Sequence, residues 1–274
     1  MNEKKLRLGL IGKDVSKSPS GRIHKFILGE LGVKCDYENF SITPAELDNV
    51  LRLLLGDFDA FNITIPYKRD VFEYLDGINS EAVACGAVNT VISATKQGYN
   101  TDGAGFLLML KSAGIRVEGK SVLVLGAGGS GRSSAVALKN AGARVAMYRR
   151  NKEALQEVCA QLGVVAETDP EAGGYDLIVN CTGVGMHDTE GVSPVSVNAF
   201  KGASAAIDLI YVPSESEFLR IAKTQGLQTL NGASMLFYQG YFADCLFLGR
   251  EPNEREAKAF YEKYVQLTTE EKTL

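Results

Sequence analysis

The chain has 274 residues, of which 45% are hydrophobic and 23% charged, a composition typical of soluble globular proteins with one large or two ordinary domains. Its net charge of −4 argues against a nucleic-acid binder, because such proteins are usually basic. Five scattered cysteines without a CxxC pair, two histidines and the absence of a long apolar run predict no metal site, no membrane span and no secretory leader, so we expect a cytoplasmic protein.

Strand-like and helix-like patterns alternate through the first half of the chain. In chain order the pattern predicts a strand at 6–11, a helix at 23–31, a strand at 36–42, a helix opening with a capping box at 43–46, and strands at 60–65 and 87–94. Such a βαβαβ order is typical of a mostly parallel sheet.

A second alternation begins near residue 120. It predicts a strand at 121–125, a helix at 130–141, a strand at 144–148, a helix at 152–162, strands at 176–181 and 205–210, and two helices in 235–274 that separate at 249–252. Because each block needs its own core, we expect two α/β domains. The first comprises 1–103 together with the C-terminal helices at about 239–274, and the second comprises 104–238.

A glycine-rich segment joins the strand at 121–125 to the helix that follows it. The segment reads Gly126-Ala127-Gly128-Gly129-Ser130-Gly131, and a GxGxxG pattern between a strand and a helix is typical of a dinucleotide site. Gly126 would allow the tight turn, Gly128 would let backbone N–H groups approach a pyrophosphate, and Gly131 would let the helix pack closely on the sheet. A purely structural glycine turn is the alternative.

The residues after the next strand distinguish between two cofactors. An NAD site normally carries an Asp or Glu there to bind the ribose 2′-hydroxyl, whereas this chain has Tyr148-Arg149-Arg150-Asn151-Lys152. Arginines suit a 2′-phosphate, and cations at the start of a helix oppose its dipole and therefore need another purpose. The sequence favours NADP, although a solvated basic helix start would look the same.

Small polar residues are unusually dense in the first half of the chain. They include Ser18 and Ser20 and lie in the segments 62–68, 86–90 and 99–103. Hydroxyls, amides, one Lys and one Asp near strand ends would suit a polyhydroxylated ligand. Ordinary turn and capping chemistry would explain any one of these segments alone.

Taken together with the glycine segment, these residues resemble the shikimate dehydrogenase family over nearly the whole chain. The matching segments are NITIPYK at 62–68, GAVNT at 86–90, NTDG at 100–103, GAGGSG at 126–131, NCTGVGM at 180–186, DLIY at 208–211 and NGASMLFYQG at 231–240. The resemblance implies an N-terminal substrate-binding catalytic domain and a C-terminal Rossmann domain for NADP. The implied reaction is the reversible reduction of 3-dehydroshikimate to shikimate, in aromatic amino acid and chorismate biosynthesis, in the cleft between the domains.

The resemblance also implies a role for individual residues. Lys68 would be the catalytic acid/base, with Asp102 beside it. The residues implied to hold shikimate or 3-dehydroshikimate are Ser18, Ser20, Thr64, Asn89, Tyr211 and Gln239. The residues implied to contact NADP are Gly126, Ala127, Gly128, Gly129 and Ser130 at the pyrophosphate, Arg149 with Arg150 at the 2′-phosphate, and Leu209 and Gly232 near the nicotinamide. Besides these small molecules we expect no nucleic acid or membrane partner, and a monomer or homodimer.

Departures from the family pattern leave alternatives open. Ser18 and Ser20 are the substrate serines if His24 is aligned without a gap, which places Gly21 where Pro is usual; Ser16 and Ser18 are the alternative pair. Of the usual Asn-Arg-Thr cofactor motif only Arg149 is kept. Alternative functions are a quinate/shikimate dehydrogenase that uses NAD, a non-catalytic shikimate- or quinate-sensing module, and another two-domain enzyme such as a methylenetetrahydrofolate dehydrogenase.

Overall fold

The computed structural model describes residues 5–270, and the chain divides into two compact units. Unit 1 consists of Met1–Gly105 and Leu236–Leu274, and unit 2 consists of Phe106–Met235. The ends of the first expected domain, residues 1–4 and 271–274, lie outside the described residues. No helix within 5–270 is both long and apolar enough to cross a membrane.

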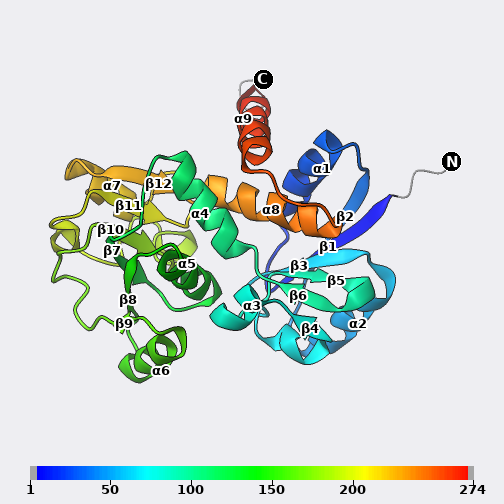
Figure 1. The fold of residues 1–274 in the computed structure, drawn as a ribbon, viewed down its shortest axis with the longest axis horizontal. Coiled ribbons are helices and arrows are strands. Elements are labelled where there is room, and N and C mark those ends of the chain that lie inside the picture. The colour runs from blue at the N-terminus through cyan, green and yellow to red at the C-terminus, as the bar shows by residue number, and fades with distance from the viewer. Residues whose placement is uncertain (1–4, 271–274) are drawn as a thin grey trace. The chain divides into compact units, whose positions relative to one another are not determined.

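Unit 1 contains one six-stranded sheet with helices packed on it (Figure 1). Its strands are β1 (Leu6–Gly12), β2 (Cys35–Ser41), β3 (Ala60–Ile63), β4 (Gly77–Ile78), β5 (Thr90–Ile92) and β6 (Gln97–Tyr99). Its helices are α1 (Ser20–Glu30), α2 (Leu47–Asp57), α3 (Ser80–Cys85), α9 (Glu254–Glu270) and the short 3₁₀ turns η1 (Pro44–Glu46), η2 (Asp70–Tyr74) and η3 (Ser93–Thr95). Helices α4 (Asp102–Ser112) and α8 (Ala233–Phe247) carry the chain between the units.

The strand order in unit 1 is β2-β1-β3-β5-β6-β4. Strands β2, β1 and β3 run parallel, whereas β5 runs antiparallel to both β3 and β6. As a result, the residues before β5 and after β6 lie at the same edge of the sheet as the carboxyl end of β3. This edge receives three of the polar segments that the sequence singles out.

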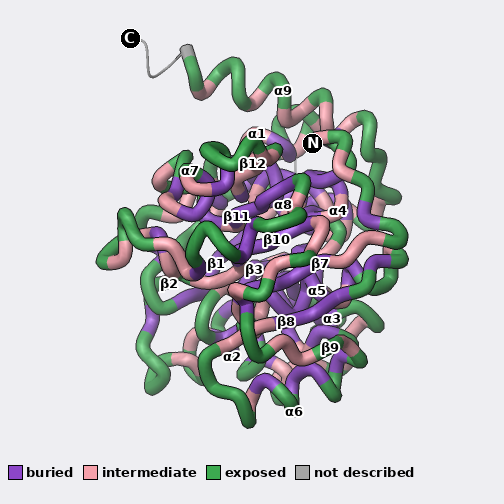
Figure 2. The backbone as a smooth tube through the Cα atoms, turned by 90° about the vertical axis from the view of Figure 1, so that its left-hand side faces the viewer, coloured by how far each residue is buried: buried purple, intermediate pink, exposed green. Residues whose placement is uncertain are grey.

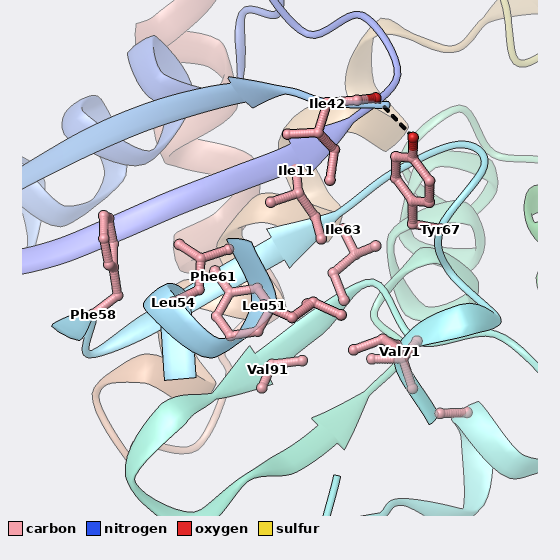
Figure 3. Packing of buried hydrophobic residues seen from close by; sticks show 12 residues of the cluster. Ile11, Ile42, Leu51, Leu54, Phe58, Phe61, Ile63, Tyr67, Val71 and Val91 are labelled. Carbon is pink, nitrogen blue, oxygen red and sulfur yellow. Dashed lines mark hydrogen bonds between the residues drawn. The ribbon is translucent and has the colours of Figure 1, made fainter. Parts of the chain in front are cut away.

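The core on one face of this sheet is built largely by α2. Its residues Leu51 and Leu54 are fully buried in one cluster with Phe61 of β3 (Figure 3). Tyr67 belongs to the same cluster, and its hydroxyl donates to the carbonyl oxygen of Ile42 at 2.7 Å. This buried tyrosine anchors the chain immediately before Lys68.

Unit 2 has a second six-stranded sheet. Its strands are β7 (Ser121–Leu125), β8 (Arg144–Tyr148), β9 (Val165–Ala166), β10 (Leu177–Asn180), β11 (Ala205–Asp208) and β12 (Gln228–Asn231). Its other helices are α5 (Gly129–Asn140), α6 (Lys152–Leu162), α7 (Glu217–Thr224) and the 3₁₀ turns η4 (His187–Thr189) and η5 (Val197–Phe200).

All strand pairs in unit 2 are parallel, in the order β12-β11-β10-β7-β8-β9. The central strands β7 and β10 are buried along nearly all of their length, as Figure 2 shows in purple. The strand order reverses between β7 and β10, and ligands of open α/β sheets bind outside the carboxyl ends of strands at such a reversal.

The predicted α/β class with mostly parallel sheets is confirmed, and β8 and α6 have the bounds predicted at 144–148 and 152–162. The strand predicted at 87–94 is wrong in extent, because only Thr90–Ile92 pairs and the η3 turn follows at once. The sequence analysis also missed α3, β4, β6, β9, α7 and β12, most of which are too short to show a hydrophobic period.

Candidate active site

The edge of the unit 1 sheet carries a buried ion pair. The Nζ atom of Lys68 lies 2.6 Å from Oδ2 of Asp102, and both side chains are at least 90% buried. Lys68 follows the carboxyl end of β3, and Asp102 is the first residue of α4 after β6. A buried charge is costly unless it is paired, and this ion pair gives each of the two buried groups its partner.

Asn89 holds the second oxygen of the Asp102 carboxylate. Its Nδ2 donates to Oδ1 of Asp102 at 2.8 Å and to Oγ1 of Thr101 at 2.9 Å. Its Oδ1 accepts from the main-chain N–H of Thr101 at 2.9 Å and from the hydroxyl of Thr90 at 2.9 Å. With donors and acceptors both engaged, the Asn89 amide has one orientation, and it presents its N–H to the carboxylate.

Turn and capping chemistry, the alternative for the segment 99–103, does not account for the Asp102 carboxylate, whose oxygens accept from Lys68 and Asn89. The carboxamide of Asn100 makes the local bond instead, since its Oδ1 accepts from the main-chain N–H of Asp102 at 3.0 Å. The other end of the same amide donates to the carbonyl oxygen of Ala87 at 2.8 Å. The Asp102 carboxylate is thereby left to Lys68 and Asn89.

The three serines near the start of α1 fall into two groups. The Ser18 hydroxyl donates to Oγ of Ser20 at 3.0 Å, and Ser20 is buried. The Ser16 hydroxyl instead donates to Oδ1 of Asp14 at 2.8 Å, at an exposed position. The structure therefore brings together the hydroxyls of Ser18 and Ser20 and directs Ser16 elsewhere. Both groups follow β1, whose carboxyl end lies beside that of β3.

Thr64 and Gln239 also belong to unit 1. Thr64 follows β3, and its side chain fills the space beside Gly12, where a Cβ would lie 2.6 Å from the Thr64 methyl carbon. Gln239, on α8, accepts from Nδ2 of Asn89 at 3.3 Å through its Oε1. Gly105 of α4 allows the backbone of α8 to approach this closely, because a Cβ at residue 105 would lie 2.7 Å from the main-chain nitrogen of Gln239.

In unit 2, the glycine segment forms a close turn between β7 and α5. Gly126 has φ +98°, a conformation that favours glycine. A Cβ on Gly131 would lie 2.2 Å from the Gly126 carbonyl oxygen, whereas a Cβ on Gly128 would meet nothing within 4 Å. Helix α5 has no side-chain cap and no acidic residue in its first turn. Its first N–H groups, those of Gly129, Ser130 and their neighbours, are therefore not engaged by a capping side chain, and such a helix start suits an anion.

The two arginines differ in setting. Arg149 is partly buried directly after β8, and Arg150 is exposed. The side chain of Asn151, accepting from the N–H of Ala154 at 2.9 Å, caps α6. No acidic side chain follows β8 until Glu153, so a phosphate beside Arg149 would meet cations and no nearby carboxylate.

Leu209 and Gly232 lie against each other after β11 and β12. A Cβ on Gly232 would lie 2.1 Å from the Leu209 carbonyl oxygen, and the Gly232 N–H donates to the carbonyl oxygen of Ile210 at 3.1 Å. Tyr211 follows them and is 37% exposed, and burial raises the pKa of its phenol.

The sequence missed the group that orders these loops. The buried carboxylate of Asp208 accepts from Nδ2 of Asn180 at 3.0 Å, from the N–H of Ile210 at 3.0 Å and from the Ser216 hydroxyl. Burial nevertheless raises the pKa of Asp208. This carboxylate ties the carboxyl ends of β10 and β11 together, and with them the segment that carries Leu209.

Comparisons with known proteins cover most of the chain. Residues 10–91 match the family model of the shikimate dehydrogenase substrate binding domain. The chain is 37% identical over 250 residues to a shikimate dehydrogenase (NADP(+)) of Thermus thermophilus, covering 90% of this chain and 94% of that protein.

Solved structures agree. The crystal structure of shikimate 5-dehydrogenase from Thermus thermophilus in complex with NADP(H) and shikimate is 35% identical, with a TM-score of 0.86, and the match covers 94% of this chain and 99% of that chain. The 5-ketofructose reductase of Gluconobacter sp. strain CHM43 is 28% identical, with a TM-score of 0.80 and coverage of 95% and 99%.

Proposed function

Because the chain belongs to the shikimate dehydrogenase family, we propose that it catalyses the reversible, NADP-dependent reduction of 3-dehydroshikimate to shikimate. The observation that carries this proposal is the buried Lys68–Asp102 pair, which Asn89 holds from a second side. A chain with this fold but no catalytic activity would not need a buried charge pair at a sheet edge, because such pairs are rarely stabilising in themselves.

In the proposed reaction Lys68 handles the proton. NADPH, when bound, supplies the hydride that reduces the substrate carbonyl carbon. The Lys68 ammonium stabilises the negative charge that develops on the carbonyl oxygen and donates a proton to it. Asp102 fixes one N–H of Lys68 and leaves the others for the substrate oxygen, while the hydroxyls of Ser18 and Ser20 would bind the substrate carboxylate. Thr64, Asn89, Gln239 and Tyr211 would contact the remaining substrate groups.

The residues of unit 2 fit NADP. The uncapped start of α5, with Gly126, Ala127, Gly128, Gly129 and Ser130, would hold the pyrophosphate. Arg149, with Arg150 near it, would hold the 2′-phosphate, because a guanidinium can make paired hydrogen bonds to phosphate oxygens. Leu209 and Gly232 would lie beside the nicotinamide. We accordingly assign cofactor binding to unit 2 and substrate binding to unit 1, apart from the substrate contact expected of Tyr211, which belongs to unit 2.

The relatives support the main function over its alternatives. These relatives are shikimate dehydrogenases (NADP(+)), which argues against an NAD-using quinate/shikimate dehydrogenase. The buried Lys68–Asp102 pair argues against a non-catalytic sensing module. We further propose a cytoplasmic enzyme, since the five cysteines, all within the described residues, form no disulfide, as is usual in reducing compartments. A monomer or homodimer is the expected assembly, which light scattering of the purified protein tests.

The direct experiment incubates the purified protein with shikimate and NADP. We expect NADPH absorbance to rise and 3-dehydroshikimate to accumulate in equal amount. The reverse reaction should consume NADPH when 3-dehydroshikimate is supplied. No turnover in either direction, with a folded protein by circular dichroism, would exclude the proposed function.

A further inference from the structure

A series of hydrogen bonds extends from the Lys68–Asp102 pair across unit 1 to Tyr37 on β2. The Tyr37 hydroxyl donates to Oδ1 of Asn62 at 2.9 Å, and Nδ2 of Asn62 donates to Oγ1 of Thr90 at 3.2 Å. The Thr90 hydroxyl donates to Oδ1 of Asn89, whose Nδ2 donates to Asp102. Asn62, Thr90, Asn89 and Asp102 are all buried.

Every bond in this series points the same way, from Tyr37 towards Asp102. The direction follows from the first donor: a phenol that donates to Oδ1 of Asn62 turns the amide so that its Nδ2 faces Thr90. The single hydroxyl proton of Thr90 then has only Asn89 to donate to, because its oxygen already accepts from Asn62. The Asn62 amide also donates to the main-chain oxygen of Asn89 at 3.3 Å. Asn62 therefore contacts the backbone of Asn89 as well as Thr90, whose hydroxyl donates to the Asn89 side chain.

Tyr37 is built to remain a donor. Burial, and the negative charge of Asp244 close by, raise the pKa of its phenol well above the ordinary value, so the hydroxyl keeps its proton at neutral pH. Its ring stacks on the imidazole of His24, with centroids 4.8 Å apart and planes 13° from parallel. On α1, Gly21 leaves room for the ring, since a Cβ there would lie 3.1 Å from Cδ1 of Tyr37.

We propose that Tyr37 is a positioning residue for the reaction assigned above: its hydroxyl, acting through Asn62, Thr90 and Asn89, holds the Asp102 carboxylate in the orientation that Lys68 needs. The inference rests on the proposed function, because it concerns the same catalytic pair. It adds that a residue on β2, with no hydrogen bond to Lys68 or Asp102 among the described residues, contributes to the rate of the reaction. Hydrogen bonds in such series polarise one another, which makes the distant member matter.

The test is the steady-state kinetics of Tyr37→Phe, which removes the hydroxyl and keeps the ring on His24. We expect kcat for shikimate oxidation to fall about fivefold, as for the loss of one neutral hydrogen bond, while KM for NADP stays unchanged. Tyr241→Phe is the matched control: it removes a buried phenol of the same unit, whose hydroxyl donates to Glu256 at 2.6 Å, and should leave kcat unchanged.

A double mutant distinguishes a positioning effect through this series from an unspecific loss of structural order. Thr90→Val breaks the series between Tyr37 and Asn89, so it should lower kcat to the same extent as Tyr37→Phe, and the two changes together should cost no more than either alone. Thr90→Val alone decides the matter if Tyr37→Phe does not fold. Unchanged kcat in the single variants, or losses that multiply in the double variant, would overturn the inference. Absence of shikimate oxidation by the unmutated protein would instead overturn the proposed function, and this inference with it.

Discussion

Lys68 and Asp102, 34 residues apart in the chain, meet through a hydrogen bond of 2.6 Å because β6 runs in the same direction as β3, with the antiparallel strand β5 between them. β3 leads the chain into the segment with Lys68, and the β5–β6 hairpin returns it to the same edge at Asp102. The carboxylate would lie at the opposite edge if β6 ran the other way. The catalytic proposal therefore depends on β3 and β6 running in the same direction on either side of the antiparallel strand β5.

Lys68→Ala should remove most of the turnover and leave the binding of NADP nearly intact. The loss of a positioned acid/base typically lowers the rate by ~10²–10⁴-fold, and the cofactor residues belong to the other unit. Turnover and NADP affinity are measured on the same preparation. A variant with more than a tenth of the unmutated kcat would contradict the assignment, and a parallel loss of NADP affinity would indicate misfolding.

Ser20→Ala should raise KM for shikimate more than Ser16→Ala does. The Ser20 hydroxyl is buried and bonded to Ser18, whereas Ser16 bonds to Asp14. A hydrogen bond to a charged group contributes ~1.5–3 kcal/mol, so we expect KM to rise by about tenfold or more for Ser20→Ala. If Ser16→Ala is the damaging change and Ser20→Ala is silent, then Ser16 and Ser18 are the substrate pair.

Arg149→Ala should weaken NADP binding by on the order of 2 kcal/mol, because it removes charge-assisted bonds to the 2′-phosphate. Arg150→Ala is the matched control and should have a smaller effect, since Arg150 is exposed and only Arg149 is partly buried against the end of β8. Calorimetric titration with NADP and NAD should show little change for NAD. The preference for NADP should also shrink with added salt, because Arg149 is only partly buried and salt screens exposed charges, with a Debye length of ~10 Å at 0.1 M.

Two glycines of the turn after β7 should respond differently to alanine. Gly131→Ala places a Cβ 2.2 Å from a backbone oxygen and should lower the free energy of unfolding by ~1–3 kcal/mol. Gly128→Ala meets nothing within 4 Å and should lower that free energy by less than ~1 kcal/mol, yet weaken NADP binding by occupying the space of the pyrophosphate. Thermal melting and NADP titration of both variants distinguish these effects; equal melting temperatures would show that α5 does not need the close contact.

The buried pair His24–Asp244 predicts a pH dependence of stability. Burial raises the pKa of Asp244 to about 6 despite the nearby His24. A carboxyl whose folded pKa is raised contributes stability that is fully present below about pH 4 and is lost as pH rises through 6. The shift corresponds to on the order of 2–3 kcal/mol. The free energy of unfolding is measured by urea titration for the unmutated protein and for Asp244→Asn. The advantage of the unmutated protein in this free energy should be largest at pH 4.5 and smallest at pH 7, and a difference that does not change with pH would contradict the argument.

Long periodic elements and the glycine turn could be predicted because their signals are local. Strand β8 and helix α6 have strong hydrophobic periods, and a strand followed by GxGxxG and a helix specifies a turn of known geometry. The polar segments that contain Lys68, Asn89 and Asp102 were likewise visible as a set. Their contact was not predictable from the residues, because β5 and β6 have only three residues each and show no direction.

The supporting groups could not be found in the sequence. His24 and Asp244 are 220 residues apart, and Tyr37 lies in a strand that reads as ordinary alternation. Asp208 stands in a recognised segment, yet its bonds to Asn180 and Ser216 depend on how β10 and β11 pair. Contacts of this kind come from tertiary packing, which the local pattern does not specify.

The most direct measurement is kcat/KM of the unmutated protein for shikimate and for quinate, each with NADP and with NAD. We predict that shikimate with NADP gives the highest value, well above shikimate with NAD, and that quinate is poorly oxidised with either cofactor. Equal values for NAD and NADP, or a preference for quinate, would contradict the account and indicate an NAD-using quinate/shikimate dehydrogenase.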